Sequence, residues 1–186
     1  MKNIKNIKFV IFALAIMIIA GFYLNGIRIT DAQTRMYETI KTSVLQKAKL
    51  MEQRMVGKKL NISVSKYKNL KEKKLLFIYN NLDCSSCIEK GFKIIKNIDS
   101  LKNGLTQVIT NYSNVSKVQL DNTYDKEILI DDNNLIKREL NFNITPLLLF
   151  VNDQFVIEKA YIPTIYHSAK DDNAFISDFI RRIRMK

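Results

Sequence analysis

The feature that most constrains the fold is the unbroken apolar run Leu75–Tyr79, which is followed closely by the chain's only two cysteines, Cys84 and Cys87. A run of this length is typical of a central β-strand that is covered on both faces. Apolar residues then recur at helical spacing as far as Asn103–Gly104, a helix-ending pair. They are Ile88, Phe92, Ile95, Ile98 and Leu101. A buried strand that leads directly into a helix predicts an α/β fold.

The remainder of the chain alternates between strand and helix patterns. We expect further strands at 107–110 and 127–130, and a hairpin formed by 147–151 and 155–162. The polar stretch 113–126 predicts at most a weak helix. A closing helix is expected over 174–184, with its apolar side chains turned inward. These side chains are Phe175, Ile176, Phe179, Ile180 and Ile183. Together the patterns predict a central mixed sheet flanked by helices.

The amino-terminal part contains an uncharged apolar segment, residues 9–27. Nineteen helical residues extend about 28 Å, which is close to the thickness of the hydrocarbon core of a bilayer. A cleaved signal peptide is the alternative, but no good A-x-A site follows the segment. We therefore expect one uncleaved transmembrane helix. The basic tail 1–8 should stay cytoplasmic, so the remainder would be extracytoplasmic or periplasmic, attached to the cell membrane by a single span.

The charge distribution argues against nucleic acid as a partner. The net charge of +12 arises entirely within residues 1–74, whereas residues 75–186 sum to zero. A nucleic-acid-binding domain should carry its basic patch on the folded domain. Residues 28–56 instead predict an amphipathic juxtamembrane helix or stalk, whose apolar face we expect to dock on the domain or the membrane. That face comprises Met36, Ile40, Val44, Ala48, Met51 and Met55.

The spacing of Cys84 and Cys87 carries the predicted chemistry. Peptide groups at a helix N-terminus stabilise a thiolate, the species that attacks disulfides. We assign Cys84 as the attacking thiol and Cys87, one turn later, as the resolving thiol. A zinc half-site is disfavoured, because His167 is the only histidine and no other thiol exists. An inert structural disulfide and a copper site that includes His167 remain alternatives, although His167 fits a surface or loop position better.

A second motif, Thr145–Pro146, directly precedes the predicted strand Leu147–Val151. Together with the order strand, CxxC helix, strand, Thr-Pro, hairpin and helix, it resembles the thioredoxin superfamily. The resemblance covers residues 57–186 and implies a thioredoxin-like fold. It also implies that Pro146 is cis and faces the cysteines, and that the backbone of Thr145 pairs with a bound substrate.

The length of the chain and its single expected anchor look like the TlpA/ResA-like group of membrane-tethered thiol–disulfide oxidoreductases. This implies a redox-active Cys84–Cys87 disulfide with no other cofactor or metal, a protein disulfide as substrate, and a membrane electron donor or acceptor. The chain departs from the family, because it has no Trp and places Asp83 before Cys84. We expect Asp83 to oppose the adjacent thiolate through like-charge repulsion, and Asp83, Ser85 and Ser86 to modulate the pair.

Two other functions are compatible with the sequence. The domain could be a non-catalytic thioredoxin-like binding module braced by the disulfide, or a Sco-like copper-handling protein, although that family spaces its cysteines by three residues rather than two. A peroxidase fits less well, since no supporting Thr/Ser-x-x-Cys and Arg arrangement surrounds Cys84.

Overall fold

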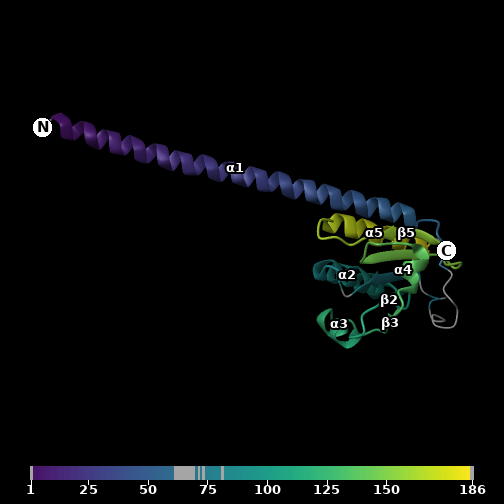
Figure 1. The fold of residues 1–186 in the computed structure, drawn as a ribbon. Helices are drawn as coiled ribbons and strands as arrows, with labels where there is room; N and C mark the ends of the chain where they lie inside the picture. Colours follow the sequence, from purple (N-terminus) through teal and green to yellow (C-terminus); the bar gives the residue numbers. More distant parts are fainter. Residues whose placement is uncertain (1, 61–69, 71, 73, 81, 185–186) are drawn as a thin grey trace. The chain divides into compact units, whose positions relative to one another are not determined.

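The computed structural model describes residues 2–60, 70, 72, 74–80 and 82–184. For residues 2–16, 18, 19, 24 and 25 it describes the backbone only. The chain forms two compact units, residues 1–43 and 44–186. Residues 2–43 of the first unit are helical and belong to α1, Lys2–Met55 (Figure 1).

Within the described part of the chain, no helix is both long and apolar enough to cross a membrane. Most of the predicted anchor, residues 9–27, lies outside the residues whose side chains are described.

The second unit is built on a five-stranded mixed sheet in the order β3-β2-β1-β4-β5. β1 pairs in parallel with β2, and β2 with β3, whereas β4 is antiparallel to both β1 and β5. The strands are β1 Leu75–Tyr79, β2 Thr106–Thr110, β3 Ile128–Ile130, β4 Leu147–Val151 and β5 Ile157–Tyr161. The predicted strands and hairpin are confirmed, with β1 at the centre of the sheet.

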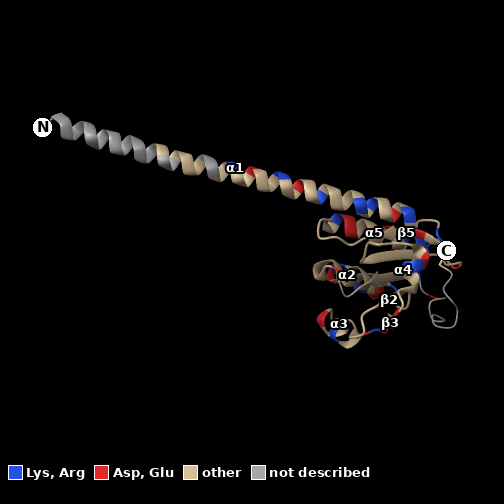
Figure 2. Ribbon diagram, viewed as in Figure 1, with Lys and Arg blue, Asp and Glu red and all other residues tan. Residues whose placement is uncertain are grey.

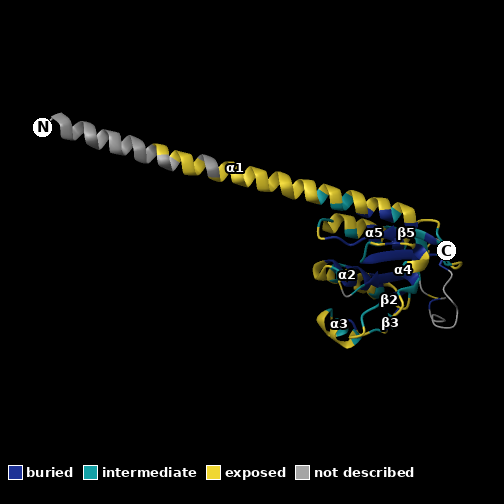
Figure 3. Cartoon of the chain, viewed as in Figure 1, coloured by how far each residue is buried: buried dark blue, intermediate teal, exposed yellow. Residues whose placement is uncertain are grey.

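Both faces of β1 are covered, because successive side chains of a strand point to opposite faces. Leu75, Phe77 and Tyr79 pack against α2, Ser85–Leu101, and α5, Ala169–Arg184. Leu76 and Ile78 belong to the other face. This face contacts α4, Leu135–Leu140, and the C-terminal end of α1. The strands are accordingly buried and the helices expose their outer sides (Figure 3).

Gly91 allows α2 to approach β1 closely. A β-carbon at this position would lie 2.2 Å from Cζ of Phe77. Phe77 is fully buried and stacks edge-on against Phe92, so its ring has little room to yield. The glycine therefore sets the depth at which the cysteine-bearing helix sits on the sheet.

The end of α1 belongs to the domain, which begins upstream of the predicted boundary at residue 57. Ala48, Met51 and Met55 are buried in the core, so docking on the domain is confirmed for this part of the predicted face. Met36 and Ile40 of the same face are 66% and 42% exposed, so for them docking on the domain or the membrane stays a prediction.

After Gly57, where φ is +84°, the chain turns and runs beside β5. Leu60 N–H donates to the carbonyl of Phe155 at 2.9 Å, and Lys59 forms an antiparallel bridge with Val156. The remainder of the predicted entry segment, 61–69, lies outside the described residues.

The structure confirms one of the helix predictions and corrects others. α4 was not expected, because its N-terminal N–H groups are bound by the carboxylate of Asp131, which the local pattern does not reveal. α5 begins five residues earlier than predicted, after a reciprocal Ser168–Asp171 capping interaction. The weak helix expected in 113–126 is α3, Val115–Asp121. Leu101, the last residue of the predicted apolar stripe of α2, is 63% exposed.

Basic and acidic residues are interspersed over the second unit (Figure 2). Its strands carry few charges, and those of the helices face outward or pair with each other. Asp178 of α5, for example, pairs with Lys159, Arg181 and Arg182, which hold the pKa of Asp178 well below its usual value although its burial opposes this. The mixture of signs agrees with the zero net charge of residues 75–186.

Candidate active site

Cys84 and Cys87 lie where β1 leads into α2. Cys84 is the N-cap residue of α2 and is exposed, whereas Cys87 is buried in the first turn; both are free thiols in this structure. The carbonyl of Cys84 accepts hydrogen bonds from Cys87 N–H and Ile88 N–H, which starts the helix. The Cys84 side chain makes no capping hydrogen bond to the helix. The first peptide N–H groups are therefore available to stabilise negative charge at Cys84.

The thiol of Cys87 is held in its protonated form. The pKa of Cys87 is raised to about 12, first by burial and then by its hydrogen bond and charge interaction with Cys84. Asp83 raises the pKa of Cys87 further, while the backbone of Ile165 lowers it. Cys87 is thus held as a thiol that donates to the Cys84 sulfur. This arrangement suits one attacking cysteine and one resolving cysteine.

Asp83 connects the cysteine segment to the Thr145–Pro146 loop. Its carboxylate accepts a 2.5 Å hydrogen bond from the hydroxyl of Thr145 and a 2.7 Å bond from Asn80 N–H. The Asn80 side-chain amide donates to Thr145 Oγ1 at 2.8 Å. Burial raises the pKa of Asp83, and these two bonds and the charge of Lys137 oppose that shift. Asp83 and Thr145 are therefore partners, although 62 residues separate them.

The Thr145–Pro146 peptide bond is cis, and Pro146 is buried. The hydroxyl of Thr145 reaches the residue before Cys84, so this loop lies against the cysteine segment. Ser85 and Ser86 are both exposed in the first turn of α2. The structure therefore brings together the sequence-predicted residues Asp83, Cys84 and Thr145 in one site.

The loop after β5 was missed by the sequence analysis. The backbone of Ile165, in this loop, contacts Cys87. Lys90 of α2 holds the loop in position. The Lys90 ammonium donates to the carbonyls of Thr164, at 3.0 Å, and His167, at 2.5 Å. It also pairs with Asp172 at 3.2 Å. A single lysine in a helix gives no sequence signal for such a role, because its partners lie more than 70 residues away.

The surface around Cys84 carries apolar side chains. Leu82 is 92% exposed and Ile165 is 56% exposed, and both belong to loops that contact the cysteine pair. Apolar side chains are therefore exposed beside the Cys84 thiol.

His167 lies in the loop between β5 and α5, as predicted, where its ring stacks on Tyr161. It is half-buried, and burial lowers its pKa; its Nδ1 atom has no hydrogen-bond partner among the described residues. No group of three or more His, Cys, Asp or Glu side chains suited to a metal ion occurs in the described part of the chain.

No family model and no curated protein matches this chain. Among solved structures, a mutant of PrxQ from Xylella fastidiosa is similar over 69% of this chain and 96% of its own, with a TM-score of 0.52 and 9% identity. A putative thioredoxin from Neisseria meningitidis is similar over 62% and 79%, with a TM-score of 0.46 and 18% identity. StoA from Bacillus subtilis is similar over 55% and 83%, with a TM-score of 0.40 and 18% identity.

The match to PrxQ, taken with the strand order and the CxxC helix, shows that this domain has a thioredoxin-like fold. The expected fold class of the domain, a central mixed sheet flanked by helices, is thereby confirmed.

The raised pKa of Cys87 predicts strongly unequal alkylation. At pH 8 iodoacetamide should modify Cys84 at least about 100-fold faster than Cys87, because Cys87 is buried and its pKa of about 12 leaves almost no thiolate. Peptide mass spectrometry over time measures both rates. In a Cys84→Ser variant Cys87 should react faster than before, because the interaction with the Cys84 sulfur is lost. Equal rates in the unmodified chain would contradict this assignment.

The Asp83–Thr145 bond predicts a pH-dependent stability effect. Because the pKa of Asp83 is raised above its ordinary value of 3.8, this group favours folding fully below pH 3.8, and that contribution is lost as pH rises through the folded-state pKa. The Thr145 hydroxyl donates a hydrogen bond to the ionised carboxylate of Asp83 and so limits this loss of stability. Thr145→Val removes that donor. We expect it to lower the free energy of unfolding by about 1 kcal/mol at pH 7 and by much less at pH 3.

Urea denaturation at both pH values measures this difference. Thr145→Ser, which keeps the hydroxyl, is the matched control and should show the smaller effect. An equal loss at pH 7 and pH 3 for Thr145→Val would mean that packing, rather than the bond to the ionised carboxylate, is responsible.

Proposed function

We propose that this chain is a thiol–disulfide oxidoreductase that reduces protein disulfides through Cys84 and Cys87. The observation that carries the proposal is the asymmetry of the pair: Cys84 is exposed at the N-cap of α2, and Cys87 is buried beside it with its pKa raised to about 12. A dithiol that cycles needs one sulfur that substrates can reach and one that waits within reach of the first. An inert brace requires neither property.

In the proposed reaction, the Cys84 thiolate attacks one sulfur of a substrate disulfide. The substrate S–S bond breaks, a mixed disulfide with Cys84 forms, and the departing sulfur takes up a proton. Cys87 then loses its proton and attacks the Cys84 sulfur, which releases the second substrate thiol. Two electrons pass to the substrate, and the Cys84–Cys87 disulfide remains until a dithiol donor protein reduces it.

We assign Asp83 as the base that accepts the proton of Cys87. It acts on Cys87 electrostatically, and burial raises its own pKa, which makes it a better base than an ordinary carboxylate. Its hydrogen bonds from Thr145 and Asn80 hold it in place beside the pair. Once Cys84 is bound to substrate, its interaction no longer raises the pKa of Cys87, so the proton leaves more readily.

The substrate is proposed to lie across Cys84, with its backbone along Thr145 and Pro146. The cis loop contacts the cysteine segment, and Leu82 and Ile165 offer apolar contact on the same surface. A protein disulfide, which presents an extended backbone and apolar side chains, fits this surface better than a small hydrophilic disulfide does.

We further propose that the protein is a single-pass membrane protein of the TlpA/ResA-like group, with the domain on the extracytoplasmic side. The uncharged segment 9–27 and the basic residues that precede it support this placement. An oxidising compartment supplies protein disulfides to reduce, and a donor in the membrane could return electrons to the pair.

The trapping of substrates tests the function directly. In a Cys87→Ala variant the mixed disulfide on Cys84 has no resolving thiol, so cellular proteins should be recovered covalently bound to the chain and should be released by dithiothreitol. The double variant Cys84→Ser/Cys87→Ala is the control and should trap none. Failure to recover any mixed disulfide from cells would count against an oxidoreductase.

A further inference from the structure

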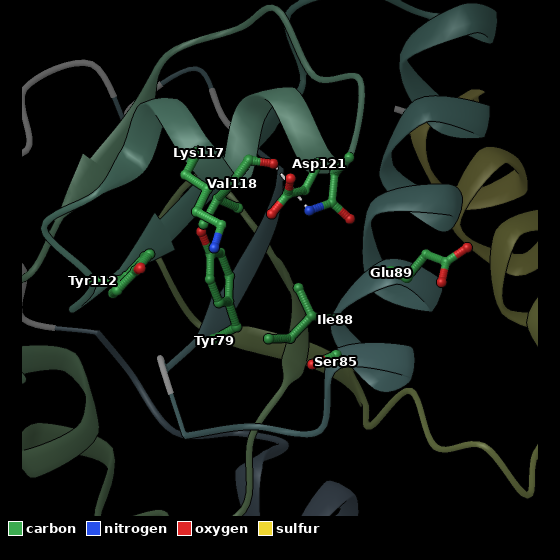
Figure 4. A pocket seen from close by; sticks show the side chains of 9 residues that line it. Tyr79, Ser85, Ile88, Glu89, Tyr112, Lys117, Val118 and Asp121 are labelled. Carbon is green, nitrogen blue, oxygen red and sulfur yellow. Dashed lines mark hydrogen bonds between the residues drawn. The ribbon is translucent and has the colours of Figure 1, made fainter.

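A pocket with a volume of about 480 Å³ adjoins the cysteine site on the side of α3. Ser85 and Ile88 of α2 line one wall, Lys117 and Val118 of α3 line the opposite wall, and Tyr79 projects from the end of β1 between them (Figure 4). Ser85 directly follows Cys84. A molecule held on the Cys84 sulfur therefore has the pocket within reach of its neighbouring groups.

The hydroxyl of Tyr79 is an unused hydrogen-bonding group at this pocket. Tyr79 is only 1% exposed, and no described residue meets hydrogen-bond geometry with its hydroxyl oxygen. Burial raises the pKa of Tyr79 to about 12, and the Thr110 side chain, acting as a donor toward the phenol oxygen, opposes this shift. The phenol therefore stays protonated, and its own proton has no acceptor within the described part of the chain. A buried donor without an acceptor is unfavourable for folding, which suggests that a ligand supplies the acceptor.

The side of the pocket that covers Tyr79 is lightly packed. Figure 4 shows the Tyr79 side chain directed from the sheet toward α3. This short helix has no fully buried residue, and Lys117 on it is exposed. Elements with few buried contacts open at low cost. A small shift of the Lys117 side chain or of α3 would therefore let an acceptor reach the hydroxyl.

The charges at the pocket nearly cancel. Lys117 and Asp121 line it with opposite signs, and the Glu89 side chain is directed away from Tyr79 (Figure 4). Ile88 and Val118 add apolar walls. An ion would lose hydration here without a net opposite charge to compensate, whereas an uncharged group with an apolar body and one acceptor oxygen would be matched by the walls and the hydroxyl.

We propose that this pocket selects substrates, by binding an uncharged, amide-bearing side chain next to the attacked cysteine, with its carbonyl accepting from the Tyr79 hydroxyl. This inference rests on the proposed oxidoreductase function and adds its substrate class: disulfides flanked by Gln or Asn. Tyr79 is a specificity-determining residue in this account. A site built around a buried donor rejects analogues that lack the acceptor more strongly than an apolar site rejects a change of size.

The test uses the reduced full-length chain and short peptide probes, acetyl-Ala-X-Cys-X-Ala-amide, whose cysteine is carried as a mixed disulfide with 2-thiopyridine. Both residues X are Gln, Leu or Glu. Cys84 forms a disulfide with the peptide sulfur and displaces 2-thiopyridone, whose absorbance gives the second-order rate constant. Cys87 then displaces the peptide thiol, and the chain ends as the Cys84–Cys87 disulfide.

We expect the Gln probe to react about tenfold faster than the Leu probe, which has nearly the same size, and faster than the charged Glu probe. In a Tyr79→Phe variant the Gln-to-Leu ratio should fall to within twofold of one. Lys93→Met is the control, because Lys93 is an exposed residue of α2 that does not line the pocket, and the Gln-to-Leu ratio should persist in this variant.

The outcomes separate the two proposals. A ratio near one in the unmodified chain, with all probes reacting, would overturn the pocket assignment and leave the oxidoreductase intact. A high ratio that persists in Tyr79→Phe would overturn the role of its hydroxyl. If the chain reacted with none of the peptide probes and also failed to react with the small uncharged disulfide 2,2′-dithiodipyridine, the proposed oxidoreductase function itself would be overturned.

Thermal unfolding provides an independent readout. Tyr79→Phe removes an unpaired buried hydroxyl and keeps the ring, so the variant should be as stable as the unmodified chain or have a Tm a few degrees higher. A marked loss of stability would mean that the hydroxyl already has a structural partner, and would overturn the inference.

Discussion

The double-sided burial of β1 is the constraint on which the rest of the site depends. Its five residues alternate between two cores, one against α2 and α5 and the other against the end of α1 and α4. With neighbours hydrogen-bonded on both edges, the strand can neither shift its register nor twist away from the sheet. The chain must therefore leave the sheet at Asn80, and the short connection sets Cys84 at the beginning of α2. Gly91 fixes the depth of that helix against Phe77.

From this frame follows the unequal environment of the two cysteines. The helix begins at the point where the chain is still exposed, so Cys84 is accessible to solvent, while Cys87 enters the interior one turn later. Burial then raises the pKa of the second thiol, and contact with the first reinforces that effect. The strand before the cysteines is entirely apolar, and Asp83 is the acidic residue that acts electrostatically on Cys87. Its bond to Thr145 joins the carboxylate, the cysteines and the cis-proline loop into one unit.

Much of this arrangement was predictable from local pattern. The apolar run of β1, the helix that follows it and the hairpin β4–β5 were all expected, because burial on two faces and helical spacing leave direct marks in the sequence. Long-range features left no such mark. The position of α4 depends on the carboxylate of Asp131, and the loop beside Cys87 is held by Lys90 through partners distant in sequence. The unpaired hydroxyl of Tyr79 becomes visible only once α2 and α3 are placed around it.

The most direct test of the central claim is the reduction potential of the Cys84–Cys87 couple in the full chain, measured by equilibration with glutathione or dithiothreitol buffers. A protein that reduces disulfides should show a reversible two-electron couple at about −250 mV or lower. A couple near −120 mV would instead indicate an oxidant of folding proteins. The absence of any reversible couple would contradict a redox function for the pair and leave a binding module braced by a disulfide.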